Sequence, residues 1–165
     1  MARKIFSSFH FADDNWRASQ VRNIGSIEGN QLANDNDWES IKNGGDRAIK
    51  AWIDSQMKGK SCVVVLIGRN TAGRKWIKYE IEKGWNDGKG VIGVYIHSLK
   101  DRWGRVTNKG RNPFDGFTVG IDKVPLSSIV KTYDPGYWTS QDTYSHIRNN
   151  IVNWIEEGIR IRGRY

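Results

Sequence analysis

The stretch SCVVVLIG, residues 61–68, decides the fold class, because six consecutive apolar residues occupy positions 62–67. An apolar run without polar alternation is typical of a strand that is covered on both faces. We therefore expect a strand over Ser61–Gly68 in the centre of a sheet.

A helix should follow this strand directly. Asn70 and Thr71 can cap a helix that runs to about Trp85. Ile77, Ile81 and Trp85 repeat at helical spacing, so they should face the sheet.

Trp76 and Glu80 form a neighbouring stripe on the same predicted helix, because residues four positions apart lie over one another. The stripe places a carboxylate beside an aromatic wall at the border of the packed face, whereas Glu82 must point elsewhere. A glutamate on a helix is usually a solvated charge, and a nearby tryptophan usually belongs to the core. A functional role for Glu80 therefore depends on where the helix lies in the fold.

Other segments alternate in the same way between strand and helix patterns. Residues 24–43 are rich in Gly, Asn and Asp and predict a long loop with at most one short edge strand. Residues 97–125 are long for a structureless connection, which is typical of a functional or internally ordered loop. Asp13 or Asp14 can cap the first helix, which should reach Asn23. The further predicted elements are strands at Lys4–Phe9, Gly90–Ile96 and Ser128–Tyr133, and helices at Asp46–Met57 and Ser140–Glu157.

Alternating strands and helices predict a single α/β domain over residues 1–165, with a flavodoxin-like, mainly parallel sheet of four to five strands. Such sheets bind ligands outside the carboxyl ends of the strands where the winding reverses. Phe9–Asp14 and Gly68–Glu80 should converge there. Fold and residue chemistry thus point to the same cleft.

Composition narrows the class of partner. A net charge of +8 and a pI of about 9.7 favour anionic partners. The basic residues are spread along the chain except at Arg160, Arg162 and Arg164, and such a short run is typical of a solvated tail rather than a nucleic-acid reader. No apolar run approaches the ~20 residues that span a bilayer, and the amino end lacks a secretion signal, so we expect a cytoplasmic protein.

The single cysteine and the eight tryptophans lead to two further expectations. Cys62, the one cysteine, lies inside the apolar strand and should be an inert core thiol. Most of the eight tryptophans should pack internally, with some left to line a pocket.

Several motifs together resemble TIR domains, and more narrowly the TIR-like proteins of the ThsB type from bacterial Thoeris anti-phage systems. Phe6–Phe9 followed by Asp13 resembles the opening TIR pattern of Phe, any residue, Ser, an aromatic residue and a later Asp. Trp76–Glu80 resembles the Trp-x-x-x-Glu of NAD-consuming TIR domains. The segments Ile5–His10, Asp37–Glu39 and Lys109–Asp115 are similar to ThsB-type segments. Residues 24–43 show no recognisable second strand or assembly loop of the family.

The resemblance implies an enzyme that cleaves NAD+ into nicotinamide and a cyclic or conjugated ADP-ribose signal, which would act on a separate effector protein. Glu80 would be the catalytic residue, stabilising oxocarbenium-like charge or holding ribose hydroxyls. Whether it also acts as a nucleophile stays open, as do self-association and the product's connectivity. NAD+ would be the substrate, with no cofactor. The candidate substrate-binding residues are Ser8, Phe9, His10, Asp13, Trp38 and Trp76.

The chemistry of these side chains suits such a substrate. Phe9, Trp38 and Trp76 offer flat π faces for nicotinamide or adenine. Arg69, Arg74 and Lys75 lie near a predicted helix start, where they can attract a pyrophosphate. Ser8, His10 and Asp13 sit at a predicted strand end and can hydrogen-bond ribose or phosphate. No metal site is expected, because His10, His97 and His146 are scattered without ligand spacing.

Plainer interpretations stay open beside these. Trp38 is as compatible with a loop staple as with a lid anchor. His10 suits a hydrogen-bonded structural role, and Asn112–Asp115 suits a turn. For the whole chain, the main alternative is a catalytically silent TIR-like module that works through protein contacts. A receiver domain is disfavoured because only Asp13 and Asp14 are acidic at the first strand's end, and nucleic-acid binding ranks last.

Overall fold

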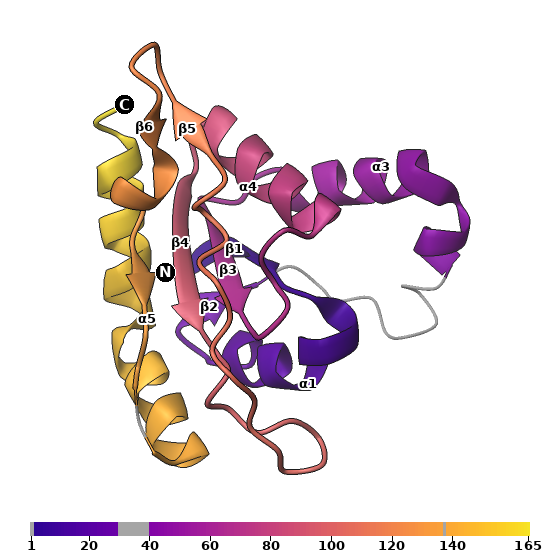
Figure 1. Cartoon of the computed structure of the whole chain (residues 1–165), viewed down its shortest axis with the longest axis vertical. Coiled ribbons are helices and arrows are strands. Elements are labelled where there is room, and N and C mark those ends of the chain that lie inside the picture. Colours follow the sequence, from indigo (N-terminus) through magenta and orange to yellow (C-terminus); the bar gives the residue numbers. More distant parts are fainter. Residues whose placement is uncertain (1, 30–39, 137) are drawn as a thin grey trace.

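The computed structural model describes residues 2–29, 40–136 and 138–165 and contains a five-stranded, all-parallel sheet (Figure 1). Its order is β2-β1-β3-β4-β7, the doubly wound order of flavodoxin-like domains. The strand bounds are Arg3–Ser8 for β1, Ile27–Glu28 for β2, Cys62–Ile67 for β3, Gly90–Tyr95 for β4 and Thr132–Tyr133 for β7. The predicted fold class is confirmed, including a short edge strand in the loop after the first helix.

β3 is buried along its whole length, as its apolar run predicts. Because successive side chains of a strand point to opposite faces, Val63, Val65 and Ile67 join one core cluster. Val64 and Leu66 join the other, together with the fully buried Cys62. One strand therefore carries the central part of both cores.

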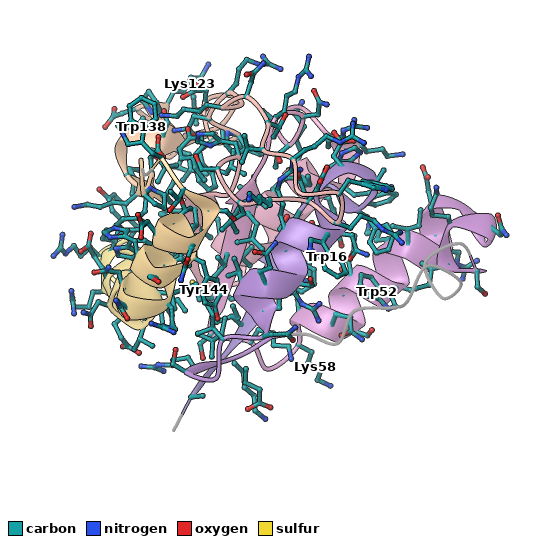
Figure 2. The ribbon with its side chains drawn as sticks, turned by 90° about the horizontal axis from the view of Figure 1, so that it is seen from below. Trp16, Trp52, Lys58, Lys123, Trp138 and Tyr144 are labelled. Carbon is teal, nitrogen blue, oxygen red and sulfur yellow. The ribbon has the colours of Figure 1, made fainter. Side chains whose placement is uncertain are left out.

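The helices cover the two faces of the sheet in pairs. α1 (Phe11–Arg22) and α5 (Ser140–Arg162) lie side by side on one face (Figure 2). α3 (Gly45–Met57) and α4 (Lys75–Asn86) cover the other. Ile77, Ile81 and Trp85 of α4 are buried against the sheet, which confirms the predicted apolar stripe, whereas Glu82 is exposed.

Two predicted helix starts are wrong. α4 begins at Lys75 rather than near Asn70, because Thr71 uses its hydroxyl to accept the backbone N–H of Gly68 at 2.8 Å and Gly73 has a φ of +83°. α1 begins earlier than predicted, at Phe11 after the N-cap residue His10, so Asp13 and Asp14 lie in its first turn instead of capping it.

The carboxyl-terminal third departs most from expectation. The predicted strand Ser128–Tyr133 is wrong over its first half, where a 3₁₀ turn at Leu126–Ser128 and the buried Ile129 and Val130 precede β7. α5 continues to Arg162, so the predicted solvated tail is wrong for Arg162, whereas Arg160 and Arg164 are exposed as predicted. Arg162 donates from Nε to the Trp85 carbonyl at 2.9 Å and lies over the Trp85 ring at 4.5 Å.

The long connection after β4 is ordered by its own side chains, as predicted. It includes the short antiparallel hairpin of β5 (Thr118–Val119) and β6 (Val124–Pro125), which projects at one end of the molecule (Figure 1). The Asn112 side chain accepts the Phe114 N–H at 2.9 Å, which confirms the predicted turn.

Of the seven described tryptophans, four pack in or against the two core clusters, in agreement with prediction, and three are exposed. Among the described residues, Trp85 is buried and Trp52, Trp76 and Trp154 are half-buried. Trp16, Trp103 and Trp138 are exposed. Basic side chains lie over several of the rings, an arrangement that keeps an indole favourable at the surface. No helix of the described residues is long and apolar enough to cross a membrane.

Candidate active site

Glu80 is held at the inner face of α4, next to the carboxyl end of β1. Its neighbours Ile77 and Ile81 pack on the sheet, and Gly84, one turn later, lies so close to Val63 that an added Cβ would meet Val63 Cγ2 at 2.5 Å. This close approach carries the Glu80 carboxyl down to the sheet, where only 7% of the residue remains exposed.

Ser8 meets Glu80 because of the two-residue repeat of β1. Phe6 belongs to the core on the α3 and α4 side, so Ser8, two positions on, points to the same side at the strand's end. The Ser8 hydroxyl donates a hydrogen bond of 2.6 Å to Glu80 Oε1. Two of the predicted site residues, 72 positions apart, are thus in direct contact.

Burial controls the ionisation of Glu80. It raises the pKa of Glu80 to about 8, although the hydrogen bond from Ser8 opposes the shift by favouring the carboxylate. A buried glutamate at the end of a central strand, with a strongly raised pKa, is typical of a functional site rather than of a surface charge.

A cavity of about 330 Å³ opens beside Glu80, between the β1–α1 and β3–α4 connections and α3. Its aromatic walls are Phe9, Phe11 and Trp76, and Phe9 and Phe11 stack with ring centroids 6.4 Å apart. Glu80 is the one acidic side chain among its described lining residues. The other lining residues are His10, Ala12, Lys42, Ile49, Ile53, Arg74, Lys75 and Ile77.

Basic side chains border this otherwise apolar cavity. Lys42, Arg74 and Lys75 are exposed residues of its lining. Lys75 lies over the Trp76 ring, 5.0 Å from its centroid, and forms an ion pair with Asp46 of α3. The cavity therefore combines a buried carboxyl, flat apolar walls and a cationic rim.

His10 lines the cavity, whereas Asp13 does not. Because α1 starts at Phe11, the helical turn directs Asp13 away from Glu80 and toward Asn70, whose side-chain amide donates to Asp13 Oδ2 at 2.8 Å. His10 Nδ1 lies 3.2 Å from the same oxygen. Burial alone would raise the pKa of Asp13, but these two contacts together hold it below its ordinary value. Asp13 thus lies beside the His10 ring, outside the cavity lining.

Two further candidates, Trp38 and Arg69, are not among the described lining residues of this cavity. Trp38 lies outside the described residues. Arg69, predicted to act with Arg74 and Lys75, borders a second cavity beyond the first turn of α1. Among the described residues, no three His, Cys, Asp or Glu side chains gather in a way that would hold a metal ion.

Six lining residues were missed by the sequence reasoning as site residues: Phe11, Ala12, Lys42, Ile49, Ile53 and Ile77. Ile49 and Ile53 were predicted as core residues. They lie on the buried face of α3, and this face also borders the cavity. Phe11 and Ala12 follow His10 directly, and the aromatic pair Phe9 and Phe11 was the available signal.

The sequence matches known proteins over most of its length. A sequence model described as "Thoeris protein ThsB, TIR-like domain" matches residues 6–101, which include Ser8 at the end of β1 and the whole of α4 with Glu80. A protein of Bacillus cereus (strain MSX-D12) named "Putative cyclic ADP-D-ribose synthase ThsB1" is 38% identical over 159 residues, covering 92% of this chain and 82% of that protein. The chain therefore belongs to the Thoeris ThsB family of TIR-like proteins.

Proposed function

We propose that this protein cleaves NAD+ at the bond between nicotinamide and ribose and releases an ADP-ribose product, cyclic or conjugated, as a signal in anti-phage defence. The observation that carries the proposal is the buried Glu80 carboxyl, hydrogen-bonded to Ser8, in the lining of a cavity with aromatic walls and a basic rim. The name of the Bacillus cereus relative, a cyclic ADP-ribose synthase, agrees with it.

One carboxyl group suffices for this bond because of the leaving group. As the C–N bond breaks, its electron pair moves to the pyridinium nitrogen, and nicotinamide departs as a neutral molecule that needs no proton. The positive charge passes to the anomeric carbon and ring oxygen of the ribose, where a carboxylate stabilises it. Glycosidases that expel an alcohol need a second, acidic carboxyl group, and the described lining of this cavity offers only Glu80.

The raised pKa of Glu80 fits a cationic substrate. At neutral pH, a pKa of about 8 leaves much of the Glu80 carboxyl protonated in the free protein. A bound pyridinium ring would bring an opposite charge close to the carboxyl and favour its ionised form. Phe9 and Trp76, which line the cavity, would stack on that ring, and Arg74, Lys75 and Lys42 would attract the pyrophosphate.

The nucleophile completes the reaction on the sugar cation. Water would give linear ADP-ribose and release a proton, whereas a group of the ADP-ribose itself would give a cyclic product. The product would then bind a separate effector protein. A catalytically silent interaction module, the alternative function, gives no reason to bury a carboxyl group beside a cavity of this chemistry.

The test is turnover of NAD+ by the wild type and by Glu80→Gln, with nicotinamide and ADP-ribose products separated by chromatography and the connectivity of the product determined by mass spectrometry and NMR. Glu80→Gln keeps the shape and a hydrogen-bond acceptor for Ser8 but removes the charge, so turnover should fall by about 10²-fold or more, as for removal of one transition-state stabiliser. Glu82→Gln, exposed on the same helix, is the matched control.

Both proteins are assayed alone and with extract from phage-infected cells, which supplies any activating factor. Turnover that survives Glu80→Gln would contradict the role of Glu80. Absence of nicotinamide release by the wild type under both conditions would contradict the enzymatic function and favour the interaction module.

A further inference from the structure

A second cavity, of about 370 Å³, lies on the other side of the first turn of α1. Its described lining comes from α1, the β3–α4 connection and the loop after β4. Ala12 lines both this cavity and the one beside Glu80, and His10 and Asp13, which contact each other, lie one in each lining. The two cavities therefore adjoin across the N-terminal turn of α1.

Asp14 forms a buried part of the wall of this second cavity. Its side chain is 1% exposed, and Oδ1 accepts from Arg17 Nη1 at 3.0 Å. Oδ2 accepts no hydrogen bond from the described residues and lies against Gly68, where an added Cβ would meet it at 2.1 Å. Oδ2 is itself buried, and burial raises the pKa of Asp14 by favouring its neutral form.

Arg17 holds the wall of the second cavity in place through hydrogen bonds to two backbone carbonyls. Its Nε donates to the Leu99 carbonyl and its Nη2 to the Arg105 carbonyl, both at 2.8 Å. These bonds fix the loop after β4 against α1, and with it the position of Trp103.

Trp103 and two arginines complete a surface suited to a nucleotide. Trp103 lines the cavity yet is 68% exposed, which leaves much of its side chain accessible. The Arg105 guanidinium lies 5.6 Å from the Trp103 ring centroid, and Arg69 borders the same cavity from the β3–α4 connection. An indole that stacks a base and guanidinium groups that bind phosphate are elements of nucleotide recognition.

NAD+ needs more room than the first cavity offers. At about 330 Å³, the cavity beside Glu80 is near the lower end of the ~300–1,000 Å³ that ligand pockets span, and NAD+ contains two nucleosides and two phosphates. The N-terminal turn of α1 lies between the cavities and has no side-chain cap, and a helix N-terminus favours an anion such as a pyrophosphate.

We infer that the cavity lined by Asp14, Arg69, Trp103 and Arg105 binds the adenosine phosphate half of NAD+, with the nicotinamide half beside Glu80 and the pyrophosphate across the first turn of α1. This inference rests on the proposed function. Adenine stacks on Trp103, and the Arg69 and Arg105 guanidinium groups attract the adenosine phosphate. The adenosine half must leave Trp103 before any nucleophile that it carries can reach the anomeric carbon.

The test is calorimetric binding of NAD+, nicotinamide mononucleotide and AMP to the Glu80→Gln variant, which holds the substrate without turning it over. Adding Trp103→Ala should raise the Kd of NAD+ and of AMP about tenfold, because one base-stacking contact is lost, and leave that of nicotinamide mononucleotide within about twofold. Trp138→Ala, 99% exposed at the start of α5 and outside both cavities (Figure 2), should change none of the three.

Arg105→Gln provides a second variant, because Arg105 contributes to the Arg17 network through its backbone carbonyl and not its side chain. It should weaken NAD+ and AMP severalfold and spare nicotinamide mononucleotide. Equal weakening of all three ligands, or none for NAD+, would overturn the inference. If AMP alone depends on Trp103, the cavity takes a free nucleotide instead of half of NAD+, which also overturns it.

Failure of the proposed function has a different signature. In that case wild-type protein releases no nicotinamide and Glu80→Gln binds neither NAD+ nor nicotinamide mononucleotide. If NAD+ is cleaved but its binding ignores Trp103, the proposed function stands and the inference fails.

Discussion

A single buried acid makes the stability of this protein depend on pH in a defined direction. The pKa of Glu80 is about 8 in the folded protein and has an ordinary value of 4.5. Between these values the unfolded chain has released the proton that the folded protein retains. Glu80 therefore stabilises the fold fully below pH 4.5, and this contribution falls as the pH rises through 8.

We predict that Glu80→Gln becomes steadily more stable relative to the wild type as the pH rises from 5 to 8. The largest slope for one group is about 1.4 kcal/mol per pH unit, and we expect a total change of about 2 kcal/mol or more. Urea unfolding of both proteins at each pH measures the difference, in which the contributions of other titrating groups cancel. A difference that stays constant with pH would mean that Glu80 is ionised throughout.

Two adjacent aspartates, Asp13 and Asp14, show which residue environments the sequence alone does not predict. The pairing of Trp76 with Glu80 was readable because it depends only on helical spacing after a strand that the apolar run identifies. The difference between Asp13 and Asp14 was not readable. It depends on a helix that starts at Phe11, and on the loop after β4, which brings its carbonyls to Arg17 and thereby buries Asp14.

At the scale of elements, the closest contact between α4 and the sheet determines where Glu80 lies. Gly84→Ala places a methyl group 2.5 Å from Val63 Cγ2, and the neighbouring β4 residue Val91 limits relief at 3.7 Å. We predict a net loss of about 1–2 kcal/mol in the free energy of unfolding, because overpacking outweighs the better helix propensity of alanine.

The same substitution should also lower NAD+ turnover, since a shifted α4 separates Glu80 from Ser8. Urea unfolding and nicotinamide release measure the two effects. Glu82→Ala, on the exposed face of α4, should stay within about 0.5 kcal/mol of the wild type and serves as the control. A Gly84→Ala protein with unchanged stability and activity would show that α4 accommodates the methyl group without moving.

Elements with strong periodicity were predictable, and those shaped by tertiary contacts were not. The bounds of β3 and α3 agree with prediction to within one or two residues, because their patterns reflect burial directly. Ile129 and Val130 look like part of a strand by composition, yet they are buried through a 3₁₀ turn, since the Leu126 carbonyl accepts both of their N–H groups. An apolar run reveals burial but not the backbone conformation that achieves it.

At the scale of the whole molecule, β3 joins the two cores into one unit. Its alternating side chains pack under α3 and α4 on one face and under α1 and α5 on the other. Loss of either helix layer would therefore expose one face of the same strand. This arrangement supports a single cooperative domain.

We predict that Ile53→Ala and Ile151→Ala, one in each core, both lower the urea midpoint in a single transition with an unchanged m-value. Each should cost about 2–5 kcal/mol, as for truncation of a fully packed side chain. Tryptophan fluorescence and far-UV circular dichroism should report coincident curves for both variants. Two separated transitions in either variant would show that the faces unfold independently.

The placement of Cys62 has a practical consequence for studies of assembly. Its thiol is wholly buried in the central strand, and burial raises its pKa, so a thiol-modifying reagent reaches sulfur only when the sheet opens. The native chain should tolerate storage without reductant. A crosslinked band on a non-reducing gel would accordingly report denatured material, and any genuine oligomer of this protein must survive in dithiothreitol.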